Sequence, residues 1–110
     1  MRQIEKQMLA AIKERRDWNS SNTTVSFTRN DYLGTCTASV LLHGNKIAEI
    51  FFGPEGTTAK FTLAGWDTNT TRSRLNALGV GVAHVRRQPV YPGGVIEDDE
   101  AWYGFEFNEK

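Results

Sequence analysis

The spacing of the apolar residues changes near residue 23 of the chain. Over residues 3–16 the apolar side chains recur at helical intervals, at Ile4, Met8, Leu9 and Ile12, which predicts an amphipathic helix. From Thr23 to Thr28 apolar and polar residues alternate instead, as expected for a strand with one buried face. The Ser- and Asn-rich segment between them, residues 17–22, is predicted to be a loop.

The next stretch predicts a β-hairpin over residues 36–52. Two runs rich in β-branched and aromatic residues flank Gly44-Asn45, which supplies the positive φ that a two-residue turn needs. This register pairs His43 with Lys46 and gives one face Val40, Leu42, Ile47 and Phe51. Because the opposite face is also partly apolar, we expect the hairpin to be central in its sheet.

The remaining half of the chain predicts further strands around one short helix. Strands are expected over residues 23–66, including the hairpin, and again over residues 80–107 with an acidic C-terminal segment. Polar residues that can cap a helix precede residues 70–78, and Gly79 is a natural stop, so this segment is predicted to be helical. Residues 1–110 therefore predict a single small α+β domain, with an antiparallel sheet of about four to six strands.

The distribution of charge adds to this picture, although the total does not. The 13 Lys and Arg residues balance 13 Asp and Glu residues, which argues against a polycation or a polyanion. The charges are nevertheless segregated, because residues 68–96 carry four arginines and no acid, whereas residues 97–110 carry six acids and one lysine. A single cysteine, Cys36, excludes a disulfide framework and a multi-cysteine metal site.

Two motifs give the chain a family resemblance. The first is the hairpin sequence LHGNKIA at residues 42–48, and the second combines Gly65-Trp66 with TTRSRLNAL at residues 70–78. With these motifs the chain resembles a family of short tailed-bacteriophage proteins that pair an HGN-x-IA hairpin with a GW…TT-x-SRLNAL helix, over roughly residues 40–103. The resemblance implies an accessory phage protein that binds host or phage machinery, and it brings no catalytic residues with it.

No catalytic constellation accompanies these motifs. The sequence lacks the phosphate-binding, zinc-protease and nucleophile-elbow patterns. His43, His84 and Cys36 are the candidate bases and nucleophile, but each fits a turn or strand position as well. The consecutive acids at residues 97–100 lack the spacing of a calcium loop. We therefore expect no enzyme, cofactor or metal site, and the enzymatic alternative is a hydrolase or nuclease that uses His84 with the acidic segment.

Two binding functions remain. In the leading interpretation the chain binds and modulates or inhibits a host or phage protein, using the acidic segment and the aromatic residues after it: Glu97, Asp98, Asp99, Glu100, Trp102 and Tyr103. The alternative is a small nucleic-acid-binding protein, whose contacts would come from Thr70, Thr71, Arg72, Arg74, Arg86 and Arg87. The acidic segment would oppose that alternative if it lay over the arginines, by pairing with them and by repelling phosphates.

The sequence also bears on location and assembly. The charged N-terminus lacks the apolar core of a signal peptide, and no apolar run approaches the roughly 20 residues that span a bilayer. We expect a protein of the host cytoplasm that does not contact the membrane. The amphipathic N-terminal helix could pack on its own sheet or on a second copy, so a homodimer is a further alternative.

Overall fold

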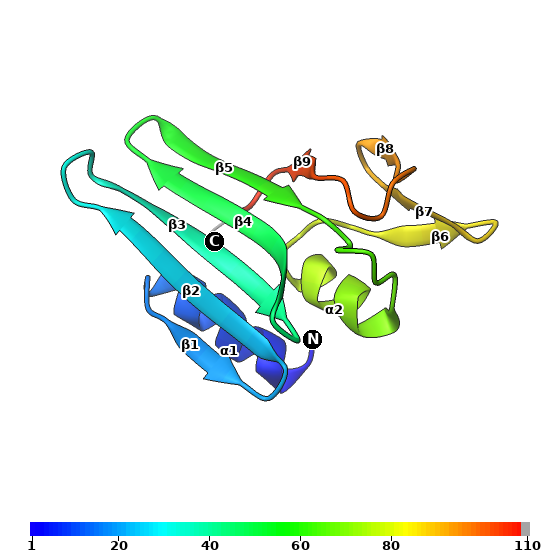
Figure 1. Cartoon of the computed structure of the whole chain (residues 1–110), viewed down its shortest axis with the longest axis horizontal. Coiled ribbons are helices and arrows are strands. Elements are labelled where there is room, and N and C mark those ends of the chain that lie inside the picture. Colours follow the sequence, from blue (N-terminus) through cyan, green and yellow to red (C-terminus); the bar gives the residue numbers. More distant parts are fainter. Residues whose placement is uncertain (109–110) are drawn as a thin grey trace.

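The computed structural model describes residues 1–108, which form two helices and nine strands (Figure 1). In chain order these are α1 (Gln3–Lys13), β1 (Trp18–Ser20), β2 (Thr23–Asn30), β3 (Thr35–Leu42), β4 (Asn45–Gly53), β5 (Gly56–Phe61), α2 (Asn69–Ala77), β6 (Ala83–Val85), β7 (Gln88–Tyr91), β8 (Gly94–Val95) and β9 (Tyr103–Phe105).

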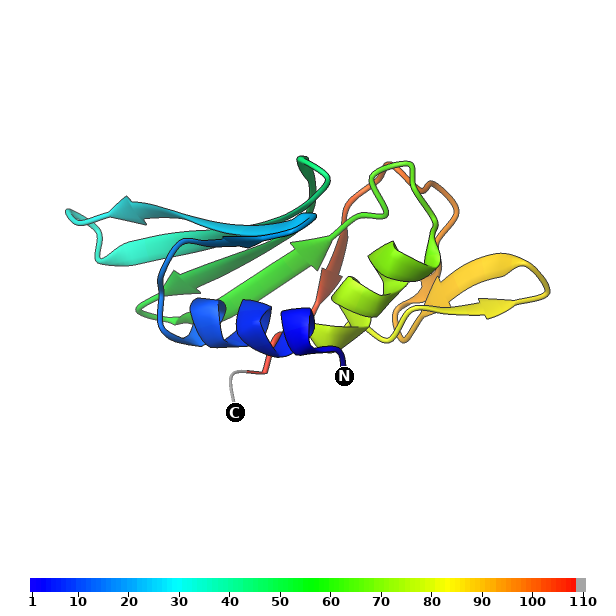
Figure 2. The same ribbon diagram turned by 90° about the horizontal axis from the view of Figure 1, so that it is seen from below.

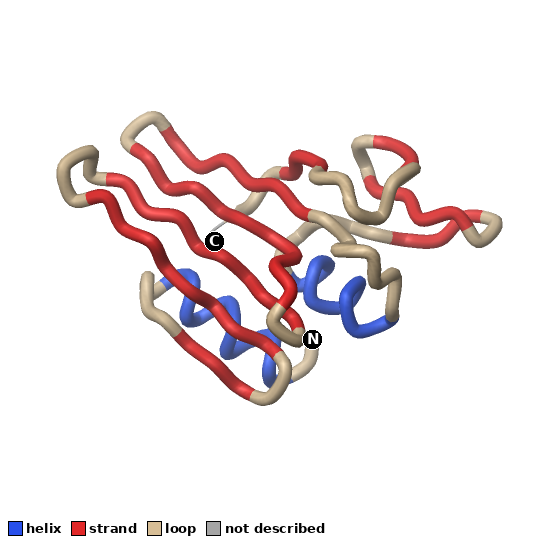
Figure 3. The backbone as a smooth tube through the Cα atoms, in the orientation of Figure 1, coloured by secondary structure: helices blue, strands red, loops and turns tan. Residues whose placement is uncertain are grey.

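Six of the strands make one antiparallel sheet, in the order β1-β2-β3-β4-β5-β9. Both helices lie on the same face of this sheet (Figure 2). The remaining strands form a small second sheet, β6-β7-β8, which projects from the end of the molecule where α2 lies (Figure 3). The predicted α+β class, with an N-terminal helix and a short second helix, is confirmed.

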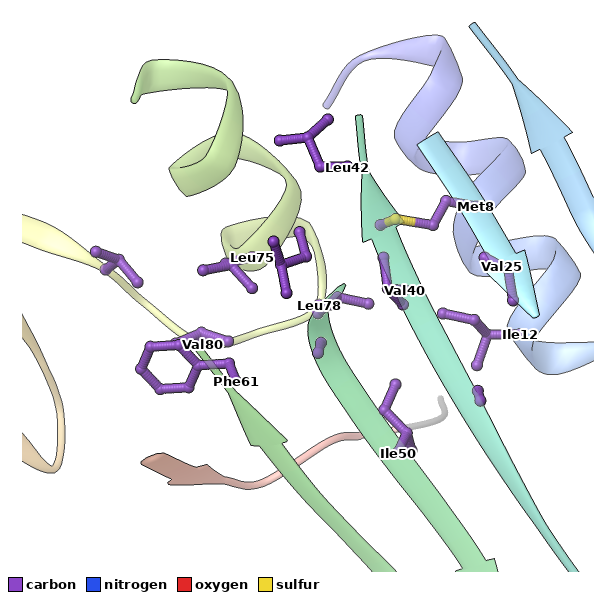
Figure 4. Packing of buried hydrophobic residues seen from close by; sticks show 14 of the residues in the cluster. Met8, Ile12, Val25, Val40, Leu42, Ile50, Phe61, Leu75, Leu78 and Val80 are labelled. Carbon is purple, nitrogen blue, oxygen red and sulfur yellow. The ribbon is translucent and has the colours of Figure 1, made fainter. Parts of the chain in front are cut away.

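The core lies between the large sheet and the two helices (Figure 4). Because alternate residues of a strand point to opposite faces, each central strand contributes every second side chain to it. Helix α1 adds the apolar stripe predicted from its spacing, and α2 adds Leu75. Fully buried members include Met8, Ile12, Val25, Val40, Ile50, Phe61 and Leu75.

The helices begin and end close to the predicted positions. Helix α1 stops at Lys13 instead of residue 16, because Arg15 adopts the left-handed conformation with φ of 56°. Helix α2 starts one residue earlier than predicted. The hydroxyl oxygen of its N-cap, Thr68, accepts a hydrogen bond from the backbone N–H of Thr71 at 3.1 Å.

The turn of the β3–β4 hairpin lies one residue earlier than predicted. Leu42 pairs with Asn45, so the two turn residues are His43 and Gly44, with φ of 52° and 80°. Both central residues of this turn type need positive φ, which Gly supplies without strain and His tolerates better than most residues.

A β-bulge then corrects the predicted faces of the hairpin. Val40 pairs with Ala48 and Leu41 pairs with Lys46, which leaves Ile47 as the extra residue. Ile47 and Ala48 are therefore both buried, and beyond the bulge the buried positions are Ile50 and Phe52. Phe51, predicted to share the face of Val40 and Leu42, is exposed on the opposite side of the sheet.

Two other strand predictions need correction. The predicted loop over residues 17–22 contains β1, whose three residues are too few to show a period but pair with β2 at the sheet edge. The predicted run of strands over residues 80–107 is divided between two sheets. In its last part only Tyr103–Phe105 pairs, with β5, and Phe107 packs on the core beyond the end of the strand.

A buried ion pair joins the two helices to each other and to the sheet. The Arg74 Nη1 atom of α2 lies 2.8 Å from Glu5 Oε2 of α1, and the two side chains are 4% and 3% exposed. The Ser73 hydroxyl donates to the same Glu5 oxygen at 2.5 Å, and Arg74 Nε donates to the hydroxyl of Thr23 at 2.9 Å. Burial alone would raise the pKa of Glu5, but the hydrogen bonds from Ser73 and Arg74 outweigh it, so this pKa lies below its ordinary value.

Replacing Arg74 tests the importance of this pair. We expect Arg74→Ala to lower the free energy of unfolding by about 3–5 kcal/mol, because it leaves the Glu5 carboxylate buried without a counter-charge. Lys6→Ala, at an exposed position of α1, is the control and should change the free energy of unfolding by about 0.5 kcal/mol or less. Urea unfolding of both variants measures the difference, and equal losses would contradict the structural role of the pair.

The lowered pKa of Glu5 also predicts a pH dependence. The carboxylate contributes stability above its ordinary pKa of 4.5, and this contribution is lost as the pH falls through the lower pKa of the folded state. Glu5→Gln should therefore flatten this part of the curve of unfolding free energy against pH. Glu55→Gln, at an exposed turn, should leave the curve unchanged.

Candidate functional site

The two sequence motifs meet around one pocket of about 340 Å³. The pocket lies between the β3–β4 turn and the first turn of α2, and we call it the motif pocket. Apolar side chains make up half of its lining, and three threonines, one asparagine and one histidine complete it. The lining residues are Leu42, His43, Asn45, Ile47, Leu63, Ala64, Trp66, Thr68, Thr70 and Thr71.

The hairpin wall of the motif pocket is fixed at two points. The backbone N–H of His43 donates to the carbonyl of Asn22 at 2.8 Å, which ties the turn to the start of β2. On the other side the carbonyl of Ile47, the bulged residue, accepts from the N–H of Thr62 at 2.9 Å. The wall is therefore held in place by backbone hydrogen bonds to neighbouring segments.

Trp66 stands at the rim of the motif pocket, with 63% of its surface exposed. The chain reverses sharply before it, because Ala64 and Gly65 both adopt positive φ, 55° and 76°. The N–H of Trp66 donates to the carbonyl of Leu63 at 2.9 Å, which closes this turn. The indole is thus displayed by a defined turn, although large aromatic side chains are usually covered.

The first turn of α2 forms the opposite wall. Thr68 caps the helix, and its hydroxyl also lies 3.0 Å from that of Thr71. Of the predicted nucleic-acid contacts, Thr70 and Thr71 therefore line the motif pocket. The Thr71 side chain is buried and occupied by the cap.

A polar cluster next to this wall holds α2 against the β6 strand. Asp67 accepts from Arg72 at 2.5 Å, and its second oxygen lies 2.7 Å from His84 Nε2. Arg72 also donates to the side chain of Asn69. Partial burial would raise the pKa of Asp67, but hydrogen bonds from His84 and Arg72 outweigh it and hold this pKa below its ordinary value.

The four arginines predicted to form one patch are not assembled in one place. Arg72 is paired with Asp67, and Arg74 is buried against Glu5. Arg86 and Arg87 form the β6–β7 turn, with φ of 52° and 68°. Within residues 1–108 neither of these two makes an ion pair or a side-chain hydrogen bond.

The predicted acidic segment, Glu97–Glu100, is an exposed loop that lies against the turn before Trp66. The carbonyl of Asp99 accepts from the N–H of Gly65 at 2.9 Å, and Asp98 accepts from the N–H of Glu100 at 2.9 Å. Across residues 1–108 no carboxylate of this loop pairs with an arginine. Within the described residues, the carboxylates of this loop therefore do not neutralise the arginines.

The two aromatic residues after this loop have different surroundings. Trp102 is partly exposed, and its ring centroid lies 5.1 Å from Lys60 Nζ. Tyr103 packs against Phe61 and Tyr91, with ring centroids 5.8 and 5.7 Å away. Tyr103 is thus part of the packing between β9 and the core, whereas Trp102 is available at the surface.

Two further properties concern the part of the chain that the structure describes. Residues 1–108 contain no group of three His, Cys, Asp or Glu side chains placed to hold a metal ion. Neither described helix has the length and apolar content needed to cross a membrane.

The fold and the pocket define a small α+β domain that presents two sequence motifs together at one end of its sheet. Residues 1–103 match the Kyanoviridae Gp96 protein family, and the chain belongs to this family of phage proteins. Comparison with the curated proteins and with the solved structures finds no match. The prediction of a phage protein is therefore confirmed, and the family match extends beyond residues 40–103 to include the N-terminal helix.

The sequence predicted only part of the lining of the motif pocket. Thr70, Thr71 and, as a candidate base, His43 were named there, whereas Leu42 and Trp66 entered as members of the two motifs. One signal was present, because the motifs contain a Gly-Trp pair in a loop, where a tryptophan is not needed for packing. The contact of His84 with Asp67 has no sequence signal, since 17 residues separate them.

The Asp67 cluster gives a direct test of this geometry. We expect the pKa of Asp67 to rise toward its ordinary value of 3.8 in the His84→Ala variant, because one of the two hydrogen-bonding partners that stabilise the carboxylate is lost. An NMR titration of the carboxyl carbon measures this pKa. Lys46→Ala removes a side chain that does not contact Asp67, so a similar rise in that control would contradict the assignment.

Proposed function

We propose that this chain is a non-enzymatic phage accessory protein of the host cytoplasm, which binds a host or phage protein and modulates or inhibits it. The observation that carries the proposal is the motif pocket, which residues of both motifs build and Trp66 borders. Exposed tryptophans beside apolar pockets are typical of the residues that dominate binding energy at protein interfaces.

The pocket suits an apolar anchor from the partner. Its volume of about 340 Å³ leaves room for one aromatic or branched aliphatic side chain, between Leu42 and Ile47 on one wall and Trp66 on another. Burying such a side chain would contribute about 1.5–3 kcal/mol. The threonines of α2 could accept or donate hydrogen bonds at the edge of the contact.

The acidic loop adds charge beside this anchor. A Cβ atom at Gly65 would lie 3.3 Å from Glu100 Oε1, so this carboxylate is adjacent to the turn that presents Trp66. The same exposed loop also contains Glu97, Asp98 and Asp99. We therefore propose a partner segment with a basic residue next to its apolar anchor, since complementary charge gives such interfaces their specificity.

The nucleic-acid alternative has less support from the arrangement of charges. Only Arg86 and Arg87 remain unpaired among its four arginines within residues 1–108. Each phosphate contact contributes about −0.9 to the slope of log binding constant against log salt concentration. Two arginines would therefore give only a weak salt dependence and a small electrostatic contribution to binding.

Substitution of Trp66 tests the proposed interface. Proteins captured from infected-cell lysate by the wild-type chain are identified, and their affinity is measured by calorimetry. We expect Trp66→Ala to weaken binding by about 10- to 100-fold through loss of the anchor contact. Tyr32→Ala is the matched control, because this aromatic residue is 95% exposed at the opposite end of β3 and should leave affinity unchanged.

The outcomes separate the interpretations. A partner that binds Trp66→Ala as tightly as the wild type would overturn the role of the motif pocket. Loss of binding in Glu100→Gln or Trp102→Ala, with Trp66→Ala unaffected, would place the interface on the acidic segment alone. Metal-dependent hydrolysis that His84→Ala abolishes would replace the proposal by the enzymatic alternative.

A further inference from the structure

The small β6-β7-β8 sheet, residues 83–95, projects as an arm with two different faces (Figure 1). Ala83 pairs with Val90, and Val90 pairs with Val95, so these residues share one face. Val85 lies two residues after Ala83 and shares this face too. Gln88, which pairs with Val85, lies on this face as well, and its side-chain amide donates to the carbonyl of Ile96 at 2.8 Å. The outer face of the arm is therefore mainly apolar, and Val85 and Val95 are 56% and 50% exposed.

The other face of the arm is turned toward the body of the protein. Tyr91 packs edge-on against Phe61, with ring centroids 5.1 Å apart. His84 is bound to Asp67 at 2.7 Å. These contacts attach the inner face of the arm to the body of the protein. They leave the outer face, which carries the valines, exposed to solvent.

Opposite charges mark the two ends of this apolar face. Arg86 and Arg87 lie at the tip of the arm. Glu97 and Asp99 lie at its root, in the segment between β8 and β9, where the carbonyl of Asp99 accepts a hydrogen bond from the N–H of Gly65. Within residues 1–108 none of these four side chains has an oppositely charged partner.

We propose that the arm binds a second copy of this chain. In a symmetric dimer with two antiparallel arms, the outer face of valines of each copy would cover that of the other. The same arrangement places the arginine tip of each arm beside the acidic root of its partner, which makes the surface self-complementary, as two-fold symmetry requires. Each chain thus carries both the basic tip and the acidic root that this pairing requires.

A nucleic acid fits this arm less well. The phosphate backbone would gain two arginines at the tip, but it would meet unpaired carboxylates at the root. It would also leave the apolar face between them unused. A second copy would pair the charges at the tip and at the root and would also cover the apolar face.

Sedimentation analysis over a range of concentrations and at two salt concentrations tests the dimer. We expect a monomer–dimer equilibrium that weakens at high salt. Arg86→Glu/Arg87→Glu should raise the dissociation constant by about tenfold or more, because attraction is replaced by repulsion at both ends. Arg86→Lys/Arg87→Lys keeps the charge and should retain the dimer.

A charge exchange gives the sharper test. Glu97→Lys/Asp99→Lys should also dissociate the dimer, since tip and root would both be basic. When this variant is mixed with Arg86→Glu/Arg87→Glu, each tip meets a root of opposite charge, and a heterodimer should form. Dissociation of both variants without recovery on mixing would overturn the proposed pairing.

A second variant of the tip distinguishes a loss of charge from misfolding of the arm. Arg86→Asn/Arg87→Gly places the preferred residues at a turn with two positive φ angles, so it removes both charges while favouring the arm conformation. It too should weaken the dimer. A wild-type chain that stays monomeric at all concentrations would overturn the proposal. So would a mobility shift with DNA or RNA that depends on Arg86 and Arg87 in a monomeric protein.

Discussion

The arrangement of this domain depends on the buried ion pair between Glu5 and Arg74. Two charges removed from water are tolerated only when hydrogen bonds complete their surroundings, and here Ser73 and Thr23 do so. The same guanidinium also donates to the side chain of Asn22 at 3.3 Å, and the carbonyl of Asn22 accepts from His43. One continuous network thus runs from α1 through α2 to the hairpin turn, and it fixes both walls of the motif pocket.

This network explains why the two motifs lie together although Gly65 follows Ala48 by 17 positions along the chain. In the helix motif, Arg74 positions α2, Arg72 holds the Asp67 cluster, and Thr71 takes part in the cap. The polar residues of that motif therefore maintain the structure. The part of the two motifs that stays open to solvent is the motif pocket, between the hairpin turn and Trp66.

The sequence was most informative where a single period or a single local signal decides the structure. The α1 stripe, the α2 cap and the turn after β3 are of this kind, and each lies within a few residues of its predicted place. The faces of β4 could not be predicted, because one bulged residue, Ile47, reverses the alternation beyond it. The pairing of arginines also escaped prediction, since the partners of Arg74 lie up to 69 residues away.

The same distinction explains why the four predicted arginines do not form one patch. Sequence reasoning selected charged residues by type, but a charge shows its role only when its partner is known. Arg74 is the least accessible of the four arginines because it stabilises the fold, whereas Arg86 and Arg87 sit in strained backbone conformations with nothing in the described chain to pair with. A two-residue hairpin turn requires positive φ at both central residues, but it favours Asn and Gly there and gives no reason for arginine. The unpaired tip and the exposed Trp66 are thus the positions where the fold itself gives no reason for the residue.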